Sequence, residues 1–179
     1  MKKIIVVFAG IITISCSKRE KDVNQQEEAM NHYKQNALLK GDDFAYGTYL
    51  EYCDNNNLYL EKLPVSLIMN QKYNSKKSYY QIYRNIIELY NKNNYKAEYL
   101  ENLNDIDKQF AISYLEEGAK KNLRTCQMTL EKILRHGYGI KKNTPKSDSL
   151  YSILEKDSAI GRIYIENKNN KSKIDKIVF

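Results

Sequence analysis

The side chains that most often carry catalysis are few in this chain of 179 residues. Its two histidines, His32 and His136, have no cysteine or carboxylate at the spacing of a metal site, and we expect His136 at the surface or at a helix end. The adjacent carboxylates Asp42-Asp43 and Glu116-Glu117 would point to different faces of a helix, which suits solvation or capping better than acid–base catalysis. The sequence predicts no catalytic residue, no metal and no cofactor.

The glycine motifs that bind phosphate or present a nucleophile are also missing. Gly137-Tyr138-Gly139 lacks the further glycine and the preceding strand of a phosphate-binding loop. No Gly-x-Ser-x-Gly elbow occurs anywhere in the sequence. We therefore expect a protein that binds and is not an enzyme. An envelope hydrolase is the alternative from another functional class.

One residue has a predicted covalent chemistry, and it is Cys16. Two lysines and an apolar run over residues 4–14 precede it, which is typical of a secretory signal peptide and too short for a transmembrane helix. Residues 13–16, Thr-Ile-Ser-Cys, resemble a bacterial lipobox, although Thr13 replaces the usual Leu. This resemblance implies that Cys16 becomes the acylated N-terminus; an ordinary signal peptide with a chance cysteine is the alternative.

The chain divides into four segments on this interpretation. Residues 1–15 form the signal peptide, and residues 16–28 carry the lipid and a flexible polar tether. Residues 29–157 form one helical repeat domain. Residues 158–179 form a C-terminal cap, either a small β-hairpin around an Asn-rich turn or a short last helix. We expect the protein in the bacterial cell envelope, on the periplasmic side of the outer membrane.

The formal charge of +7 bears on which partners this chain could bind, and the cysteines bear on whether it contains a disulfide. Lysines are spread among Asn and Glu along the chain, so we expect solubility and some attraction to anionic surfaces, and no nucleic-acid binding. Cys53 and Cys126 fall in helices of different predicted repeats. We expect both to be buried small side chains and not a disulfide.

The fold class expected is all-α. Apolar residues recur near every 3.6 positions, and only two prolines and seven glycines interrupt them. Pro64 and Pro145 are each placed where a helix begins, and Gly41 is a candidate break. The predicted helices cover residues 27–53, 64–71, 78–91, 106–120, 123–136 and 146–156.

A weak internal echo suggests that these helices form repeats. Asp107, Ala111 and Leu115 stand 36 positions before Asn143, Ser147 and Tyr151 and share with them a size pattern: a polar cap, a small residue four positions on, then a large residue. A period of this length is typical of stacked helical repeats. The sequence thus predicts a short α-solenoid of antiparallel helix pairs.

The segment 107–155 resembles the Sel-one-like repeat, a relative of the tetratricopeptide repeat. Cys126 takes the small position of the first helix, and Gly137, Gly139 and Ile140 take the turn. The resemblance implies that Gly137 ends a helix with positive φ and that Gly139 lets the chain pass close to a neighbouring helix. Glu131 departs from the family's usual Gly, which would push helices apart or turn that face to solvent.

Such a repeat implies a binding scaffold, and the sixteen tyrosines suggest where a partner would bind. We expect a concave surface lined in part by tyrosines at helical spacing, because Tyr is favoured at interfaces. These are Tyr46, Tyr49, Tyr79, Tyr83 and Tyr90. The predicted function is binding to another protein in the envelope. An immunity protein that neutralises a toxin from neighbouring bacteria is the alternative, which a neighbouring toxin gene would favour.

Overall fold

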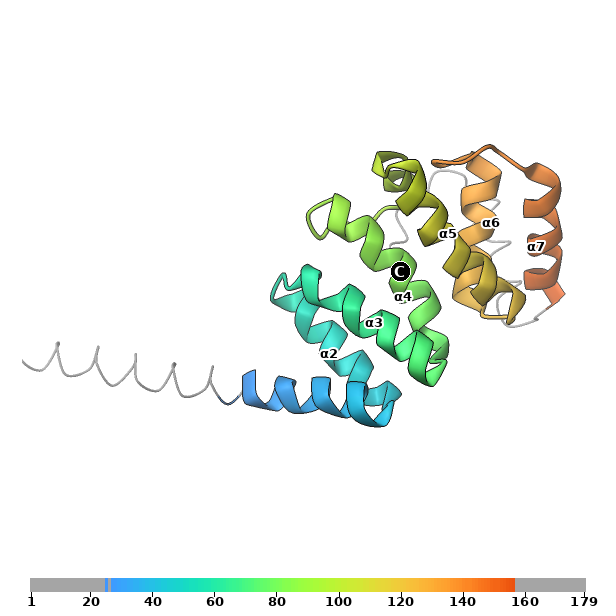
Figure 1. The fold of residues 1–179 in the computed structure, drawn as a ribbon. Coiled ribbons are helices and arrows are strands. Elements are labelled where there is room, and N and C mark those ends of the chain that lie inside the picture. Colours follow the sequence, from blue (N-terminus) through green and yellow to red (C-terminus); the bar gives the residue numbers. More distant parts are fainter. Residues whose placement is uncertain (1–24, 26, 157–179) are drawn as a thin grey trace, which may run out of the picture. The chain divides into compact units, whose positions relative to one another are not determined.

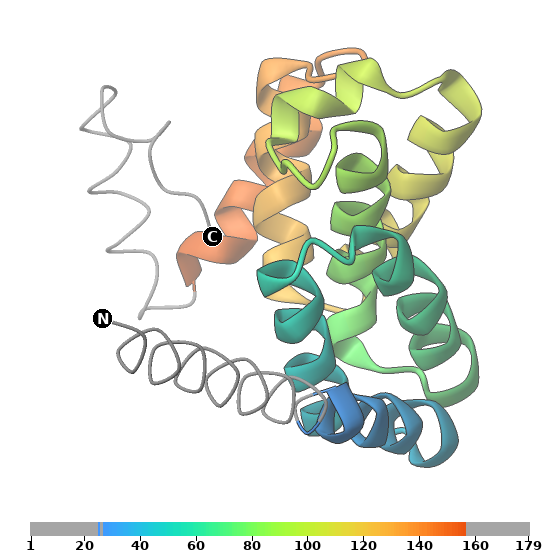
Figure 2. The same ribbon diagram turned by 90° about the vertical axis from the view of Figure 1, so that its left-hand side faces the viewer.

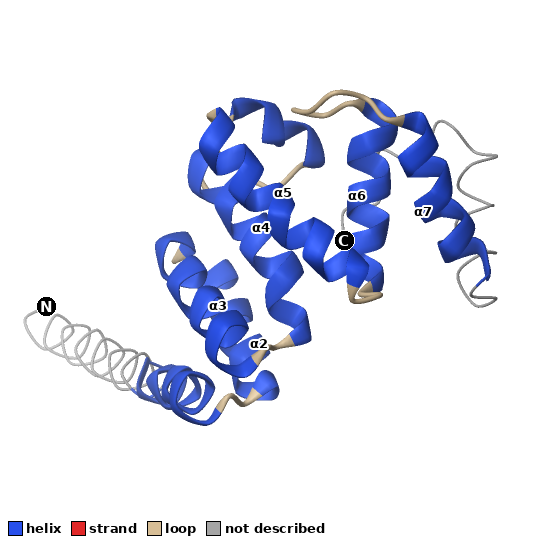
Figure 3. Ribbon diagram, turned by 45° about the vertical axis from the view of Figure 1, so that its right-hand side comes forward, coloured by secondary structure: helices blue, strands red, loops and turns tan. Residues whose placement is uncertain are grey.

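The computed structural model describes residues 25 and 27–156, and every regular element in this part of the chain is a helix (Figure 3). The all-α class is therefore confirmed for these residues. The predicted signal peptide, Cys16 and the C-terminal segment 158–179 lie outside the described residues. Within the predicted tether, residues 25, 27 and 28 are already helical.

The helices follow one another through short connectors. Their bounds are residues 27–40, α2 (Asp43–Asn55), α3 (Tyr59–Tyr73), α4 (Lys76–Tyr90), the 3₁₀ helix η1 (Ala97–Asn102), α5 (Asp105–Lys120), α6 (Arg124–His136) and α7 (Thr144–Lys156) (Figure 1). The helices predicted from residue 78 onward agree with α4 to α7 to within two residues. Helix η1 was not predicted, because its two buried apolar residues, Ala97 and Leu100, are too few to show a period in the sequence.

The long first helix predicted over residues 27–53 is in fact two helices. Gly41 takes a φ of +70°, which ends the first helix. The Oδ1 of Asp42 then accepts the N–H groups of Phe44 and Ala45 at 2.9 and 3.0 Å and so caps α2. The break expected at Gly41 is confirmed.

The short helix predicted to begin at Pro64 is longer, because α3 begins at Tyr59 and contains Pro64. An interior proline removes a helix hydrogen bond and costs about 3 kcal/mol. The helix continues through it because Val65, Ser66 and Met69 lie buried on one side of α3. Tertiary packing here outweighs the local preference.

The chain forms two compact units, Met1–Tyr52 and Cys53–Phe179, with the boundary inside α2. In the first unit Ala37, Ala45 and Leu50 are buried. In the second unit each of α3 to α6 packs against the next α-helix in the chain, and η1 contacts α4 and α6. Figures 1 and 2 show this succession from two directions. The main core comes from α4, η1, α5 and α6, with Ile82, Leu115 and Ile133 fully buried.

Two small residues let α5 and α6 approach closely. A Cβ on Gly118 of α5 would lie 2.5 Å from the Sγ of Cys126 on α6, and 3.1 Å from the Cβ of Tyr79. Cys126 and Cys53 are both buried and form no disulfide, as predicted. Burial raises the pKa of the Cys126 thiol to about 12, which makes it unreactive at neutral pH.

The Gly137–Gly139 turn has the two roles expected of it. Gly137 ends α6 in the left-handed conformation, with a φ of +81°. Gly139 has a φ of +63°, and a Cβ there would lie 2.9 Å from the backbone carbon of Leu100 in η1. The second glycine is thus required both by backbone conformation and by the close approach to η1.

The positions of α5 and α7 that the 36-residue spacing matches are alike in burial but differ in helix capping. Ala111 and Ser147 are both fully buried, and Leu115 and Tyr151 are both buried. Asn143 caps α7 by accepting the N–H of Lys146 at 3.0 Å. Asp107 has no such role: Asn104 caps α5 and accepts the N–H of Asp107, because α5 begins earlier relative to the echo.

Candidate interaction surfaces

Four of the five tyrosines predicted to contact a partner are core residues. The exposed fractions are 0% for Tyr46, 3% for Tyr49, 2% for Tyr79 and 0% for Tyr83, against 43% for Tyr90. A partner cannot reach the four buried rings without unfolding part of the protein. The prediction of a tyrosine-lined groove is therefore wrong for these four, because helical spacing marks a buried face and a binding face alike.

Tyr83 belongs to a cluster of three phenols. Its ring centroid lies 6.1 Å from that of Tyr95 and 6.3 Å from that of Tyr80, and Tyr80 and Tyr95 lie 6.2 Å apart. Burial raises the pKa of all three hydroxyls above the ordinary value of 10.0, most clearly for Tyr83 and Tyr95. These phenols stay protonated at any physiological pH.

Tyr90 is held at the surface by polar contacts with the start of α5. Its hydroxyl donates to Asp107, and the side-chain amide of Asn104 donates to the Tyr90 hydroxyl at 2.7 Å. Hydrogen bonding to Asp107 raises the pKa of Tyr90. Among the five predicted tyrosines, it is the one that a partner could contact.

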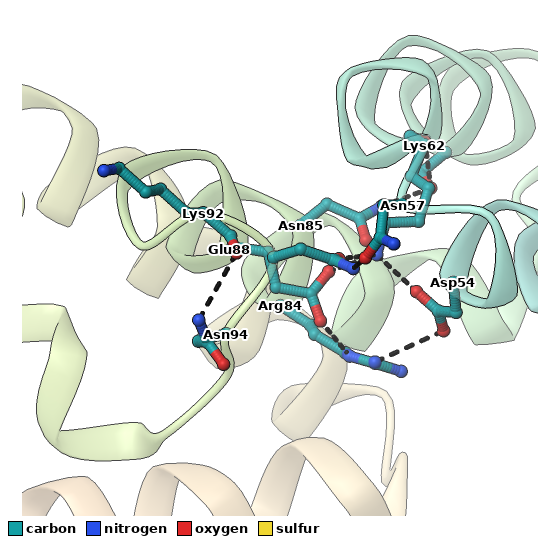
Figure 4. A network of polar contacts seen from close by, with 10 residues as sticks. Asp54, Asn57, Lys62, Arg84, Asn85, Glu88, Lys92 and Asn94 are labelled. Carbon is teal, nitrogen blue, oxygen red and sulfur yellow. Dashed lines mark hydrogen bonds and ion pairs between the residues drawn. The ribbon is translucent and has the colours of Figure 1, made fainter.

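A charged cluster lies buried between α3 and α4, and we call it the Lys62 cluster (Figure 4). Lys62 of α3 is 1% exposed, as is Glu88 of α4. The Nζ of Lys62 donates to Glu88, to Asp54 at 2.5 Å and to Asn93 at 3.2 Å. An ammonium has three donors, so these contacts use all of them.

Arg84 completes this cluster on its outer side. Its Nε donates to Glu88 at 2.7 Å, and its Nη2 lies 3.3 Å from Asp54. Burial lowers the pKa of Arg84, but the two carboxylates outweigh burial and leave the pKa above its ordinary value. The cluster thus contains two cations and two carboxylates, and these paired charges link α3 to α4. Because each charge is paired, the cluster is a poor candidate for proton transfer.

Neither Lys62 nor Glu88 was identified from the sequence. Lys62 precedes the buried residues Val65, Ser66 and Met69 by three, four and seven positions. That spacing places it on their side of the helix. The sequence signal that could have predicted the burial of Lys62 is therefore its helical spacing from these buried residues.

A second buried carboxylate, Glu131 of α6, joins α6 to α7. It is 2% exposed, and it accepts hydrogen bonds from Arg135 at 2.5 Å and from Ser147 at 2.9 Å. Arg135 also donates to Asp148 at 3.0 Å. The expectation that Glu131 would turn this face of α6 to solvent is therefore wrong. The small side chain of Ser147 leaves room for the Glu131 carboxylate between α6 and α7.

Large apolar side chains are exposed in both units of the described chain: Leu39 and Phe44 in the first, and residues of α3, α4, α5 and α7 in the second. Ile106 and Phe110 of α5 are 80% and 42% exposed, and they lie one turn apart on the same face. Phe110 packs edge-on against Tyr114, with ring centroids 5.2 Å apart. Leu60 of α3 and Ile153 of α7 are also exposed. The start of α5, beside Tyr90, carries the densest group.

A cavity of about 350 Å³ opens where α4 and α6 begin. Its lining includes Lys76, Lys77 and Tyr80 from α4, and Arg124 and Cys126 from α6. It holds no carboxylate among its lining residues and no paired nucleophile and base. Its three cations therefore suit an anionic group.

The remaining candidate residues lie apart from these features. His136 is exposed in the last turn of α6 and stacks on Tyr138, with centroids 5.0 Å apart. His32 lies 3.0 Å from the side-chain amide of Asn36. Within the described residues, no group of His, Cys, Asp and Glu could hold a metal ion, and no helix is long and apolar enough to cross a membrane.

Comparisons with protein-family models, curated proteins and solved structures found no match to this chain. The geometry above therefore has to support any functional proposal by itself.

Proposed function

We propose that this chain is a helical-repeat lipoprotein of the bacterial envelope that binds another protein and does not catalyse a reaction. The adjacent helix pairs from α3 to α7 are what a short α-solenoid of the Sel-one-like type would contain. Each pair covers its neighbour's apolar side, so the array offers an extended surface for a partner.

The observation that carries this proposal is the exposed apolar group at the start of α5. Ile106 is 80% exposed, Phe110 follows one turn later, and Tyr90 is fixed nearby through Asp107. Apolar and aromatic side chains gathered on one surface are typical of protein interfaces. The buried carboxylates, by contrast, are paired within the fold, and this argues against the hydrolase alternative.

The test is partner capture with the full-length protein in its own bacterium. Chemical crosslinking and mass spectrometry should identify an envelope protein with wild type, and Ile106→Glu combined with Phe110→Gln should remove it. Leu60→Glu, which places the same charge at a site 67% exposed on α3, serves as the matched control. If the partner survives the α5 variant, or if no protein is ever captured, the proposal fails.

The membrane anchor needs a separate test. Acylation of Cys16 predicts incorporation of labelled fatty acid, which Cys16→Ala or globomycin should abolish. Cys16→Ala should also move the protein from the membrane fraction to the soluble fraction. Unchanged labelling in the variant would rule out Cys16 as the lipidated residue.

A further inference from the structure

Six cations gather at one edge of the second unit, where two interhelical turns meet. The α3–α4 turn and the α5–α6 turn are neighbours, because the Nζ of Lys121 donates to Asn74 at 3.4 Å and the Tyr79 hydroxyl contacts both Asn74 and Glu117. Segments 71–81 and 117–128 contain one acid, Glu117, and six cations. We call these cations the basic edge: Lys72, Lys76, Lys77, Lys120, Lys121 and Arg124.

The basic edge is accessible and has a cavity in it. All of its lysines are exposed, and Arg124 is partly exposed. Lys76, Lys77 and Arg124 line the cavity of about 350 Å³, together with the hydroxyl-bearing Tyr80 and the amide-bearing Gln81. An acidic side chain entering it would meet three cations and further hydrogen-bonding groups. Linear spacing along the chain did not reveal this cluster, since the two segments are some forty residues apart.

Half of these cations oppose helix stability. Lys72 and Lys120 lie in the last turns of α3 and α5, where a positive charge is favourable. Lys76, Lys77 and Arg124 lie in the first turns of α4 and α6, where a positive charge is unfavourable. Neither first turn contains an acid, whereas the first turn of α5 contains Asp105 and Asp107. Residues that break a local rule in this way often serve a function.

We propose that the basic edge binds an acidic segment of a partner protein, with a carboxylate side chain entering the cavity beside Lys76, Lys77 and Arg124. This inference rests on the proposed protein-binding function and names the charge of the partner. Complementary charge speeds association and excludes wrong partners. A flat anionic membrane would be attracted by the lysines alone and would make no use of the cavity, so the cavity favours a protein segment.

The test uses the full-length protein and a fluorescein-labelled decamer of glutamate, with a decamer of glutamine as the neutral comparison. Wild type should bind the glutamate peptide alone, and binding should weaken as NaCl rises, because salt screens exposed charges. Lys76→Glu combined with Lys77→Glu should weaken binding by about tenfold or more, since like charges then face each other. The matched control is Lys141→Glu with Lys142→Glu, an equal change of charge in the connector that follows α6.

The stability of the Lys76→Glu/Lys77→Glu variant is a second measurement, which distinguishes a binding role of these lysines from a role in holding the fold together. The Lys76→Glu/Lys77→Glu variant should unfold at the same or a higher urea concentration than wild type, because acids suit the first turn of α4. The inference is wrong if this variant is less stable, if the control pair weakens binding equally, or if wild type binds anionic lipid vesicles and not the peptide. If Ile106→Glu/Phe110→Gln loses the cellular partner and Lys76→Glu/Lys77→Glu keeps it, the proposed function is supported and the inference about the basic edge is wrong.

Discussion

At the scale of single residues, the buried charges show how closely this fold depends on pairing. Lys62 is almost completely removed from water, and its three donors have three acceptors. Desolvating such a cation costs several kcal/mol, which its neighbours must offset. Removing one member of the cluster should therefore cost more than the pair contributes to stability.

The Lys62→Met substitution should lower the free energy of unfolding by about 3 kcal/mol or more, because Glu88 would remain buried with Arg84 as its remaining cation. Urea unfolding followed by circular dichroism measures this change. Replacing both Lys62 and Glu88 by Met should recover part of the loss, since no carboxylate is then left buried. Asp54→Asn should cost less, because Asp54 is 31% exposed. If Lys62→Met left the free energy of unfolding unchanged, this account would be wrong.

Gly118 offers a second prediction at this scale. Alanine usually stabilises a helix relative to glycine by about 1 kcal/mol. Here Gly118→Ala should instead destabilise the protein by about 1–3 kcal/mol, because the new Cβ would lie 2.5 Å from the Sγ of Cys126. Thermal unfolding would measure the change.

Cys126→Ala in the same chain provides the internal control, since it removes the sulfur that the new methyl group would meet. The double variant Gly118→Ala/Cys126→Ala should therefore be more stable than the sum of the two single changes predicts. Additive effects would mean that α5 and α6 do not meet at this point.

At the scale of elements, α4 and the connector that follows it contain tyrosines that resist ionisation, Tyr83 in α4 and Tyr95 in the connector. Burial raises the pKa of Tyr83 and of Tyr95 well above 10.0. Above about pH 10 the unfolded chain loses these protons while the folded protein keeps them, so the free energy of unfolding falls as pH rises. Below pH 10 both states keep the protons, and the phenols add no pH dependence.

Tyr83→Phe should make the alkaline loss of stability less steep. Urea midpoints measured between about pH 9 and 11 would give the slope for each protein. The other ionisable groups are common to both proteins, so their effects cancel in the comparison. Equal slopes would mean that Tyr83 is not protected from ionisation in the folded state.

The elements also show what the sequence could and could not reveal. Strong apolar stripes predicted α4 to α7 closely, and the Gly137–Gly139 turn was predicted with its physical role. The start of α3 was missed because local rules treat Pro64 as a beginning, whereas buried Val65 and Met69 hold the helix through it. A proline is a strong local signal, and tertiary packing overrode it.

The candidate surfaces were less predictable than the helices. Periodicity places a tyrosine on a face but does not say whether another helix covers that face, so buried Tyr83 and exposed Tyr90 were predicted alike. The basic edge depends on two turns that meet only in the folded protein. Charge counted along the chain could not show it, because lysines in separate turns looked evenly spread.

At the scale of the whole molecule, burial is uneven between the two compact units. The main core cluster contains residues from Tyr79 to Leu134, all in the second unit. Helix α4 alone has eight buried residues, whereas residues 27–40 have one, Ala37. Local opening is easiest where few apolar contacts hold the backbone. Residues 27–40 should therefore open without unfolding the second unit.

Hydrogen exchange followed by mass spectrometry tests this difference. Amides of residues 27–40 should exchange about a hundredfold faster or more than those of α4 to α6, because only complete unfolding of the second unit exposes the latter. Lys62→Met should speed exchange in α3 and α4 more than in residues 27–40, since its partners Asp54, Glu88 and Asn93 all belong to the second unit. Equal protection along the chain would mean that both units unfold as one. If residues 27–40 open easily while the second unit stays protected, the binding surfaces on α4 to α6 remain intact during that opening.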